Sequence, residues 1–221
     1  RAAFAGLAQP WKEPVGSGAW GYERDKFQAA HDALPGMPAS PSPADLEAAR
    51  ALVAEVGPTQ PIVVASDGSS ARSVIAGALV DAARSIGMEA TIVQIPTQQY
   101  GEYYVDPQAR QQADLFSDDY FISKNDPVGF YKNGASDSTV QWVFKDPDYD
   151  ALVAQGRAAL DDGQRSDIAI ELARRWAEAM PWIPVVLGPS TVALADGATG
   201  VPASGCYRYY PWAADLGSAG A

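Results

Sequence analysis

The stretch PIVVASDGSSARSVIAGALVDAARSIGMEATIVQI, residues 61–95, decides the fold class of this chain. Its first apolar run, residues 61–65, is short and uninterrupted, as expected of a strand that is buried on both faces. A helix is predicted at about residues 70–86, ended by Gly87, and a second strand at 89–95. A strand, a helix and a strand at this spacing predict a parallel pair joined by a right-handed crossover. We therefore expect an α/β fold with a mostly parallel sheet flanked by helices.

The flanking sequence predicts further helices and short strands. Ser42 can cap a helix at residues 44–56 and Pro43 suits its first turn, whereas residues 8–43 are rich in Pro, Gly and Ser and are expected to be irregular. Downstream, we expect a helical segment at 97–104, a third strand at 114–120, antiparallel helices at about 147–160 and 164–180, and short strands at 183–187 and 191–194. Leu160 is expected to face inward from the first of these paired helices.

Composition excludes several classes of function. The net charge of −11 argues against nucleic acid and anionic membrane as partners, because both bind basic surfaces. An apolar fraction of 47%, with 6 Trp and 10 Tyr, indicates a packed core. No stretch approaches the ~20 apolar residues of a membrane-spanning helix. Because the chain begins at Arg1 rather than Met, we expect it to be part of a longer protein.

Few residues offer catalytic or metal-binding chemistry. His31 is the only histidine; it has no recognisable nucleophile beside it and is expected to be a solvated loop residue. One imidazole does not make a metal site, so no metal and no cofactor are expected. The segment 67–72 could hold an anion at a helix N-terminus, but simple helix capping is favoured because the P-loop lysine is absent. The single Cys206 excludes an internal disulfide and is expected to be a buried, inert thiol.

Carboxylates cluster on and after the predicted third strand. The cluster consists of Asp114, Asp118, Asp119 and Asp126. Three interpretations remain open: a hydrolase pair, a solvated acidic surface, or an edge that faces a ligand. In open α/β sheets the binding crevice lies beyond the carboxyl ends of the strands, where residues 119–127 should fall.

A series of landmarks runs through the second half of the chain in a fixed order. The landmarks are Ala113-Asp114-Leu115-Phe116, Tyr120-Phe121, Asp126-Pro127, Asp146-Pro147-Asp148-Tyr149 and Met180-Pro181-Trp182-Ile183-Pro184. Their order resembles the C-terminal half of a family 5 extracellular solute-binding protein, the peptide/nickel-type receptor of ABC importers. The resemblance implies a lobe of the periplasmic-binding-protein type II kind over residues 1–182, with 1–43 as an irregular lead-in. Residues 183–221 would then return to the other lobe of the intact receptor.

The resemblance also implies a function. The protein would be a monomeric receptor, anchored as a cell-surface lipoprotein or free in the periplasm, with no enzymatic activity. It would capture a small molecule, an oligopeptide or an oligosaccharide-like solute and deliver it to ABC permease subunits. Two alternatives remain from the residues alone: a hydrolase that uses Asp118, Asp119 and Asp126, or a sensing or interaction lobe that takes no part in transport.

The resemblance points to specific ligand-binding residues. In the family, an aromatic and then an acidic residue after the third strand face the ligand, and in peptide-binding members that acid holds the amino group. Counting along the landmarks puts Tyr120 at the aromatic position and Ser123 at the acidic one. Serine cannot neutralise an ammonium group, so the expected ligand carries no buried cationic amine. The expected ligand-binding residues are Gln98, Tyr100, Asp119, Tyr120, Phe121, Ser123 and Asp126.

Overall fold

The computed structural model describes residues 4, 6–35, 41–57, 59–120, 122, 124–141, 144–188, 193, 195–200 and 214–218. The helices are α1 (Arg24–Ala33), α2 (Pro43–Val56), α3 (Ser70–Ser85), α4 (Thr97–Tyr100), α5 (Val128–Tyr131), α6 (Pro147–Ala158) and α7 (Asp162–Ala179). The strands are β1 (Gln9–Pro10), β2 (Ile62–Ser66), β3 (Ala90–Gln94), β4 (Leu115–Phe116), β5 (Val186–Leu187), β6 (Ala198–Thr199) and β7 (Gly217–Ser218). Short 3₁₀ helices cover Ser17–Ala19, Gly101–Tyr104, Ala109–Gln112 and Lys132–Gly134.

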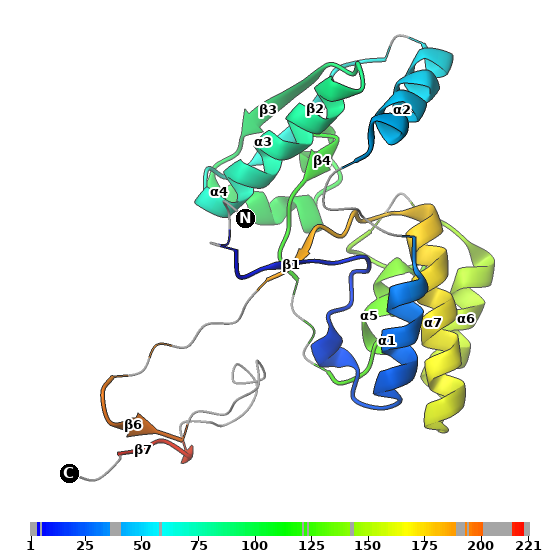
Figure 1. Cartoon of the computed structure of the whole chain (residues 1–221), viewed down its shortest axis with the longest axis vertical. Helices are drawn as coiled ribbons and strands as arrows, with labels where there is room; N and C mark the ends of the chain where they lie inside the picture. Colours follow the sequence, from blue (N-terminus) through cyan, green and yellow to red (C-terminus); the bar gives the residue numbers. More distant parts are fainter. Residues whose placement is uncertain are drawn as a thin grey trace.

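These elements form two packed bodies that meet near β1 (Figure 1). The sheet body contains α2, α3, α4 and a three-stranded sheet of order β3-β2-β4, in which both neighbouring pairs are parallel. On one face of the sheet, Val64 packs against Val80 of α3. On the other face, the side chains of the sheet pack against Tyr100 and Tyr103. The prediction of an α/β fold with a parallel sheet flanked by helices is therefore confirmed.

Local signals explain the helix starts that the sequence predicts. At α2, the Ser42 side chain accepts a hydrogen bond from the backbone N–H of Asp45, and the Asp45 carboxylate accepts one from the backbone N–H of Ser42. At α6, Asp146 caps the first turn and Pro147 occupies the first helical position. Each device satisfies backbone donors that a helix terminus would otherwise leave unpaired.

The helical body packs α1, α5, α6 and α7 around aromatic side chains. The buried indole of Trp176 on α7 contacts the rings of Phe130, Tyr131 and Tyr149, with centroid distances of 5.7, 6.0 and 6.4 Å. Such tilted arrangements of rings are the favoured geometry of aromatic pairs. Trp176 is therefore the centre of this core.

The expectations for residues 8–43, for His31 and for Leu160 differ from the structure. Residues 8–43 are not wholly irregular, because α1 lies within them, and His31 is buried on that helix against the ring of Trp11 at 4.0 Å. Phe27 and His31 are its only buried residues, so α1 has almost no apolar periodicity to reveal it. Leu160 is 97% exposed, because α6 ends before it and Arg165 binds the carbonyl oxygens at that end.

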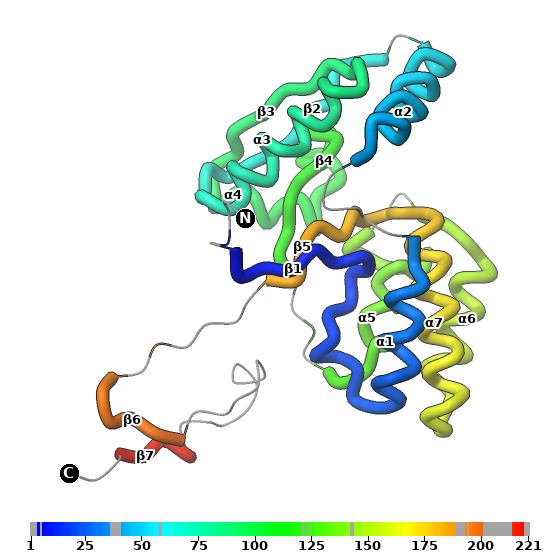
Figure 2. The backbone as a smooth tube through the Cα atoms, viewed as in Figure 1, coloured from blue at the N-terminus to red at the C-terminus, as the bar shows by residue number. Residues whose placement is uncertain are grey.

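One antiparallel pair lies where the two bodies meet (Figure 1). Figure 2 shows β1 and β5 lying together, with Gln9 opposite Leu187 and Pro10 opposite Val186. The predicted strand at 183–187 is thus reduced to two residues, and that at 191–194 falls largely outside the described residues, as does Cys206. The small pair of β6 and β7 stands apart from both bodies (Figure 1). No helix in the described ranges has the length and apolarity that crossing a membrane requires.

Candidate functional site

The carboxyl ends of β2, β3 and β4 meet at one edge of the sheet. We call residues 66–67, 94–100 and 117–120 the strand-end edge, since each range follows or ends one of these strands. Parallel strands bring their carboxyl ends to the same side, which is where open α/β sheets bind ligands. The predicted location of a site is therefore formed by residues far apart in the sequence.

Tyr120 presents a half-exposed ring at the end of this edge. The side chain is 49% exposed, and its ring packs against Phe130 at 5.1 Å and Trp182 at 5.8 Å. The Tyr120 hydroxyl accepts a hydrogen bond of 3.1 Å from Asn133 Nδ2. One face of the ring is thus held by the helical body, and the exposed half is available for stacking or apolar contact with a solute.

Tyr100 has a different position from the one expected. It is only 3% exposed, so its ring belongs to the core beneath the edge rather than to an open wall. Its hydroxyl donates a hydrogen bond of 2.9 Å to the carbonyl oxygen of Ser117. Tyr100 therefore braces the segment that follows β4, while Gln98 on the same short helix is exposed.

Asp119 lies exposed beside Tyr120 and is paired with Arg72. The distance from Arg72 Nη2 to Asp119 Oδ1 is 3.3 Å, and the Asp119 side chain is 76% exposed. Its neighbour Asp118 accepts a hydrogen bond from the hydroxyl of Tyr104. Sequence reasoning named Asp119 as a site residue but missed Arg72. The only sequence signal for Arg72 is its position in the first turn of α3.

Residues 67–72, which were expected to cap α3, are held by an ion pair between Asp67 and Arg72. The Asp67 carboxylate accepts hydrogen bonds from the backbone N–H of Ser69, at 3.0 Å, and from Arg72, whereas the Ser69 side chain makes no cap. Asp67, one of the expected capping residues, thus forms an Asx turn just before α3. Two carboxylates, Asp67 and Asp119, already bind Arg72, which disfavours an anion at this helix N-terminus.

Comparison with known proteins gives a consistent result. No protein-family model matches the chain, and no curated protein matches it. Among solved structures, the substrate-binding protein CtaP from Listeria monocytogenes superimposes with a TM-score of 0.65 at 20% identity, over 81% of this chain and 34% of that one. NikA from Staphylococcus aureus, in complex with Ni(L-His)2, gives 0.62 at 19% identity, over 82% and 37%. A mannohexaose-bound periplasmic oligopeptide-binding protein from Thermotoga maritima gives 0.65 at 12% identity, over 90% and 40%.

The fold is periplasmic-binding-protein type II. Sequence identities of this size establish the fold that is shared. The chain spans between about a third and two fifths of the length of the solved structures that it matches.

Within this periplasmic-binding-protein fold, Asp126 has internal partners. Its carboxylate accepts hydrogen bonds from Arg165 Nε at 3.2 Å and from the Tyr22 hydroxyl at 3.0 Å. Burial acts to raise the pKa of Asp126, but these hydrogen bonds and the Arg165 charge outweigh it and hold the pKa below its usual value. Asp126 therefore joins α7 to the residues before α5, and its assignment to ligand binding stays a prediction.

Each of the three aspartates named for a hydrolase is held by a partner of its own. Asp118, Asp119 and Asp126 bind three different partners: Tyr104, Arg72 and Arg165 respectively. Among the described residues no group of three His, Cys, Asp or Glu side chains could hold a metal ion. These contacts give no sign of the hydrolase function that remained as an alternative. Phe121 and Ser123, the remaining predicted site residues, lie outside the residues that the structure describes.

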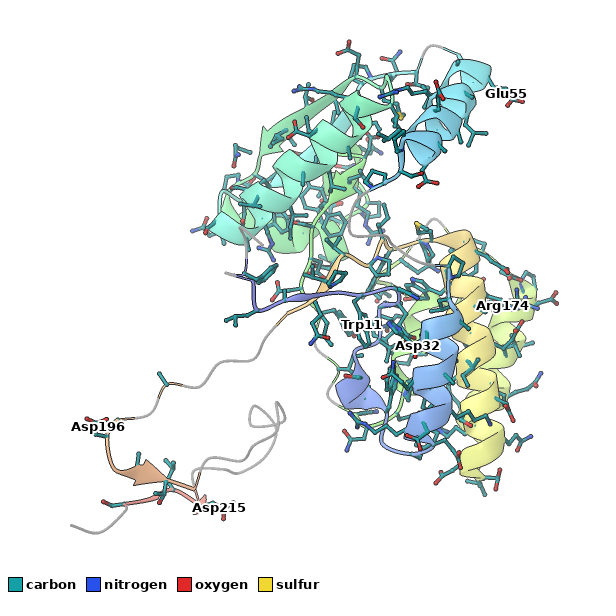
Figure 3. The ribbon with its side chains drawn as sticks, in the orientation of Figure 1. Trp11, Asp32, Glu55, Arg174, Asp196 and Asp215 are labelled. Atoms are coloured by element: carbon teal, nitrogen blue, oxygen red, sulfur yellow. The ribbon has the colours of Figure 1, made fainter. Side chains whose placement is uncertain are left out.

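A buried polar network, which sequence reasoning missed, lies near β1. The Glu13 carboxylate lies 2.9 Å from His31 Nδ1 and accepts a hydrogen bond of 2.7 Å from the Tyr131 hydroxyl. Burial raises the pKa of Glu13, and its two hydrogen-bond partners partly offset this effect. Figure 3 shows Trp11 beside α1, where its ring stacks on His31. The network fastens the segment after β1 to the helical body.

A shallow groove of about 460 Å³ lies on the outer side of the helical body. It is lined by Phe144, Asp146, Arg174, Arg175, Glu178 and Ala179. Figure 3 shows Arg174 projecting outward from α7. Its guanidinium pairs with Glu171 and Glu178, and Arg175 pairs with Asp146, so both arginines are occupied by carboxylates of the protein itself.

Proposed function

We propose that this chain is the ligand-binding lobe of an extracytoplasmic substrate-binding protein that serves an ABC importer. The observation that carries the proposal is the superposition of 81% of the chain, with a TM-score of 0.65, on an ABC transporter substrate-binding protein. The strand-end edge supports it, because a half-exposed aromatic side chain lies where type II sheets bind solutes.

In this proposal the lobe supplies one wall of a closing cleft. The exposed half of the Tyr120 ring gives stacking and apolar contact, while Gln98 and Asp119 offer polar groups. The rest of the receptor supplies the opposing wall, and closure presents the solute to permease subunits in the membrane. The receptor acts as a monomer, either lipid-anchored at the cell surface or free in the periplasm.

The proposed ligand carries no cationic amine at this edge. Asp119, the exposed residue that directly precedes Tyr120, is already paired with Arg72, and the expected acidic position is Ser123. An ammonium group would therefore lose its hydration without gaining a free carboxylate. A neutral oligosaccharide, a blocked peptide or an uncharged metabolite fits better, and the Thermotoga maritima protein of the same fold was crystallised with mannohexaose.

The proposed division of the chain follows the sequence expectation. Residues 1–182 form the lobe and 183–221 return to the other lobe of the intact receptor, with β5 as the first contact of the returning segment on β1. The apolar side chains of Ile183, Val185 and Val186 are exposed. This exposure supports the proposal that they are buried against the other lobe in the intact receptor.

Two measurements on the intact protein test this function. Native mass spectrometry of the purified receptor should detect a co-purifying solute, and calorimetry should show binding of mannohexaose or N-acetylated tetra-alanine in preference to free tetra-alanine. Deletion of the gene should abolish uptake of the co-purifying compound while its breakdown in cell extracts continues. Normal uptake in the deletion strain would contradict a transport role and favour a sensing or interaction role.

A further inference from the structure

Arg72 contacts the chain beyond each of the three parallel strands. Its Nη1 atom lies 2.5 Å from Asp67 Oδ2, just after β2, and its Nη2 atom lies 3.3 Å from Asp119 Oδ1, just after β4. Its Cζ atom lies 4.5 Å from the centre of the Tyr100 ring, on the helix that follows β3. One guanidinium therefore joins three segments that the sequence separates by about 20 to 50 residues.

The three contacts differ in how firmly they hold Arg72. The Asp67 side chain is 2% exposed, and hydrogen bonds from Ser69, and then Arg72, keep its pKa below the usual value. A buried carboxylate that stays ionised anchors the guanidinium strongly, and the Tyr100 ring below Cζ adds a cation–π contact. Asp119, by contrast, is largely exposed. Arg72 is thus fixed on its inner side and reaches outward to Asp119.

The segment after β4 needs such a support. The strand pairing of β4 with β2 ends at Phe116, so residues 117–120 continue beyond the ladder. The Tyr100 hydroxyl donates a hydrogen bond to the Ser117 carbonyl oxygen, and the Arg72 guanidinium lies over the Tyr100 ring. Arg72 therefore acts on this segment both directly, through Asp119, and indirectly, through Tyr100.

We propose that Arg72 is a positioning residue, which sets Asp119 and Tyr120 at the strand-end edge by tying together the chain beyond all three strands. The relevance to ligand binding rests on the proposed function, whereas the positioning itself does not. A lysine at this position would keep the charge, but it lacks the planar fork that reaches two carboxylates and stacks on a ring. Positioning of the strand-end edge therefore requires the planar shape of the Arg72 guanidinium as well as its charge.

Hydrogen–deuterium exchange of the ligand-free protein tests the proposal. In Arg72→Gln, amide exchange in peptides covering 115–120 should rise on the order of tenfold, with a smaller rise in Arg72→Lys, while peptides of α7 stay unchanged. Arg84→Gln is the matched control, because Arg84 lies on the same helix and binds the Ala90 carbonyl away from the edge. Equal exchange at 115–120 in Arg72→Gln and Arg84→Gln would overturn the positioning role.

A second variant separates positioning from general loss of the fold. Asp119→Asn removes the charge of the outer contact alone and should raise exchange in residues 117–120 without affecting β2 or β3. The double variant Arg72→Gln/Asp119→Asn should exchange in 117–120 no faster than Arg72→Gln alone, because both changes break the same link. Additive effects would show that Arg72 does not act through Asp119. None of these measurements needs a ligand, so they decide this proposal even if the proposed solute class is wrong.

Discussion

Arg165 and Asp126 are joined by two hydrogen bonds, one from Nε and one from Nη2, to the two oxygens of the same carboxylate. The same guanidinium also binds the carbonyl oxygens of Gly156 and Ala159 at the end of α6. Asp126→Ala should lower the free energy of unfolding by about 2–3 kcal/mol, because it leaves a half-buried guanidinium without its anion. Urea denaturation at neutral pH measures this. Arg174→Ala, which breaks exposed pairs on α7, should cost less than about 1 kcal/mol.

The Asp126 contribution should depend on pH. Although burial acts to raise it, the hydrogen bonds and charge of Arg165 hold the pKa of Asp126 below its ordinary value, so the native state favours the carboxylate. The stabilisation is therefore complete above the unfolded pKa of about 4 and is lost as the pH falls through the lower folded pKa. The difference in unfolding free energy between the wild type and Asp126→Asn should shrink as the pH is lowered below about 4. A difference that stays constant from neutral pH down through this range would remove Asp126 as the titrating group.

The buried network of Glu13, His31 and Tyr131 should be sensitive to truncation. Glu13→Ala leaves two buried polar groups without their acceptor and should lower the free energy of unfolding by about 1–3 kcal/mol. Glu13→Gln keeps an acceptor oxygen and should cost less than half as much. Thermal or urea denaturation measures both. Glu55→Ala, at the exposed end of α2 (Figure 3), is the control and should change stability by less than about 0.5 kcal/mol.

Gly134 has no room for a side chain. A Cβ atom at this position would lie 2.7 Å from Trp176 Cζ3 and 2.8 Å from the Tyr149 hydroxyl. Gly134→Ala should therefore lower the free energy of unfolding by about 1–3 kcal/mol through overpacking of the aromatic core. Gly77→Ala is the matched substitution, because a Cβ atom there meets nothing within 4 Å and α3 should gain up to about 1 kcal/mol. Equal melting temperatures of the two variants would contradict this.

The exposed ring of Tyr120 should contribute to solute affinity in the intact receptor. Tyr120→Ala should weaken binding of the co-purifying solute by about 1–3 kcal/mol through lost stacking and apolar contact. Tyr120→Phe removes only the hydroxyl that accepts from Asn133 and should cost less, and Ser123→Ala should cost about 1 kcal/mol for one neutral hydrogen bond. Calorimetry decides this, and unchanged affinity in Tyr120→Ala would remove the residue from the site.

The sheet and the long helices could be predicted because their signals are local. The run 61–65 is apolar throughout, and α2 and α6 both begin with a cap followed by proline. Helix α1 could not be predicted in the same way, because its buried face consists of Phe27 and a histidine. A histidine gains a buried position only through its neighbours, here Trp11 and Glu13, and sequence periodicity does not record them.

The candidate site was only partly predictable for a related reason. Tyr120 is the last residue of the third strand as predicted, 114–120, but β4 ends at Phe116 and Tyr120 lies four residues beyond it. Tyr100 was expected on the surface, yet its hydroxyl finds the carbonyl of Ser117 and the ring is buried. Arg72 gave little signal, since its importance comes from Asp67, Tyr100 and Asp119, which meet only after the three strands align.

The antiparallel pair of β1 and β5 has a consequence for how this unit can be carried from one polypeptide to another. Because Gln9 lies opposite Leu187, the 177 intervening residues begin and end at the same place in the structure. A unit whose two ends are neighbours can be spliced into a host loop, or exchanged between hosts, without stretching either connection. Residues 10–186 are in this sense a transferable unit, closed by two short strands that pair with each other.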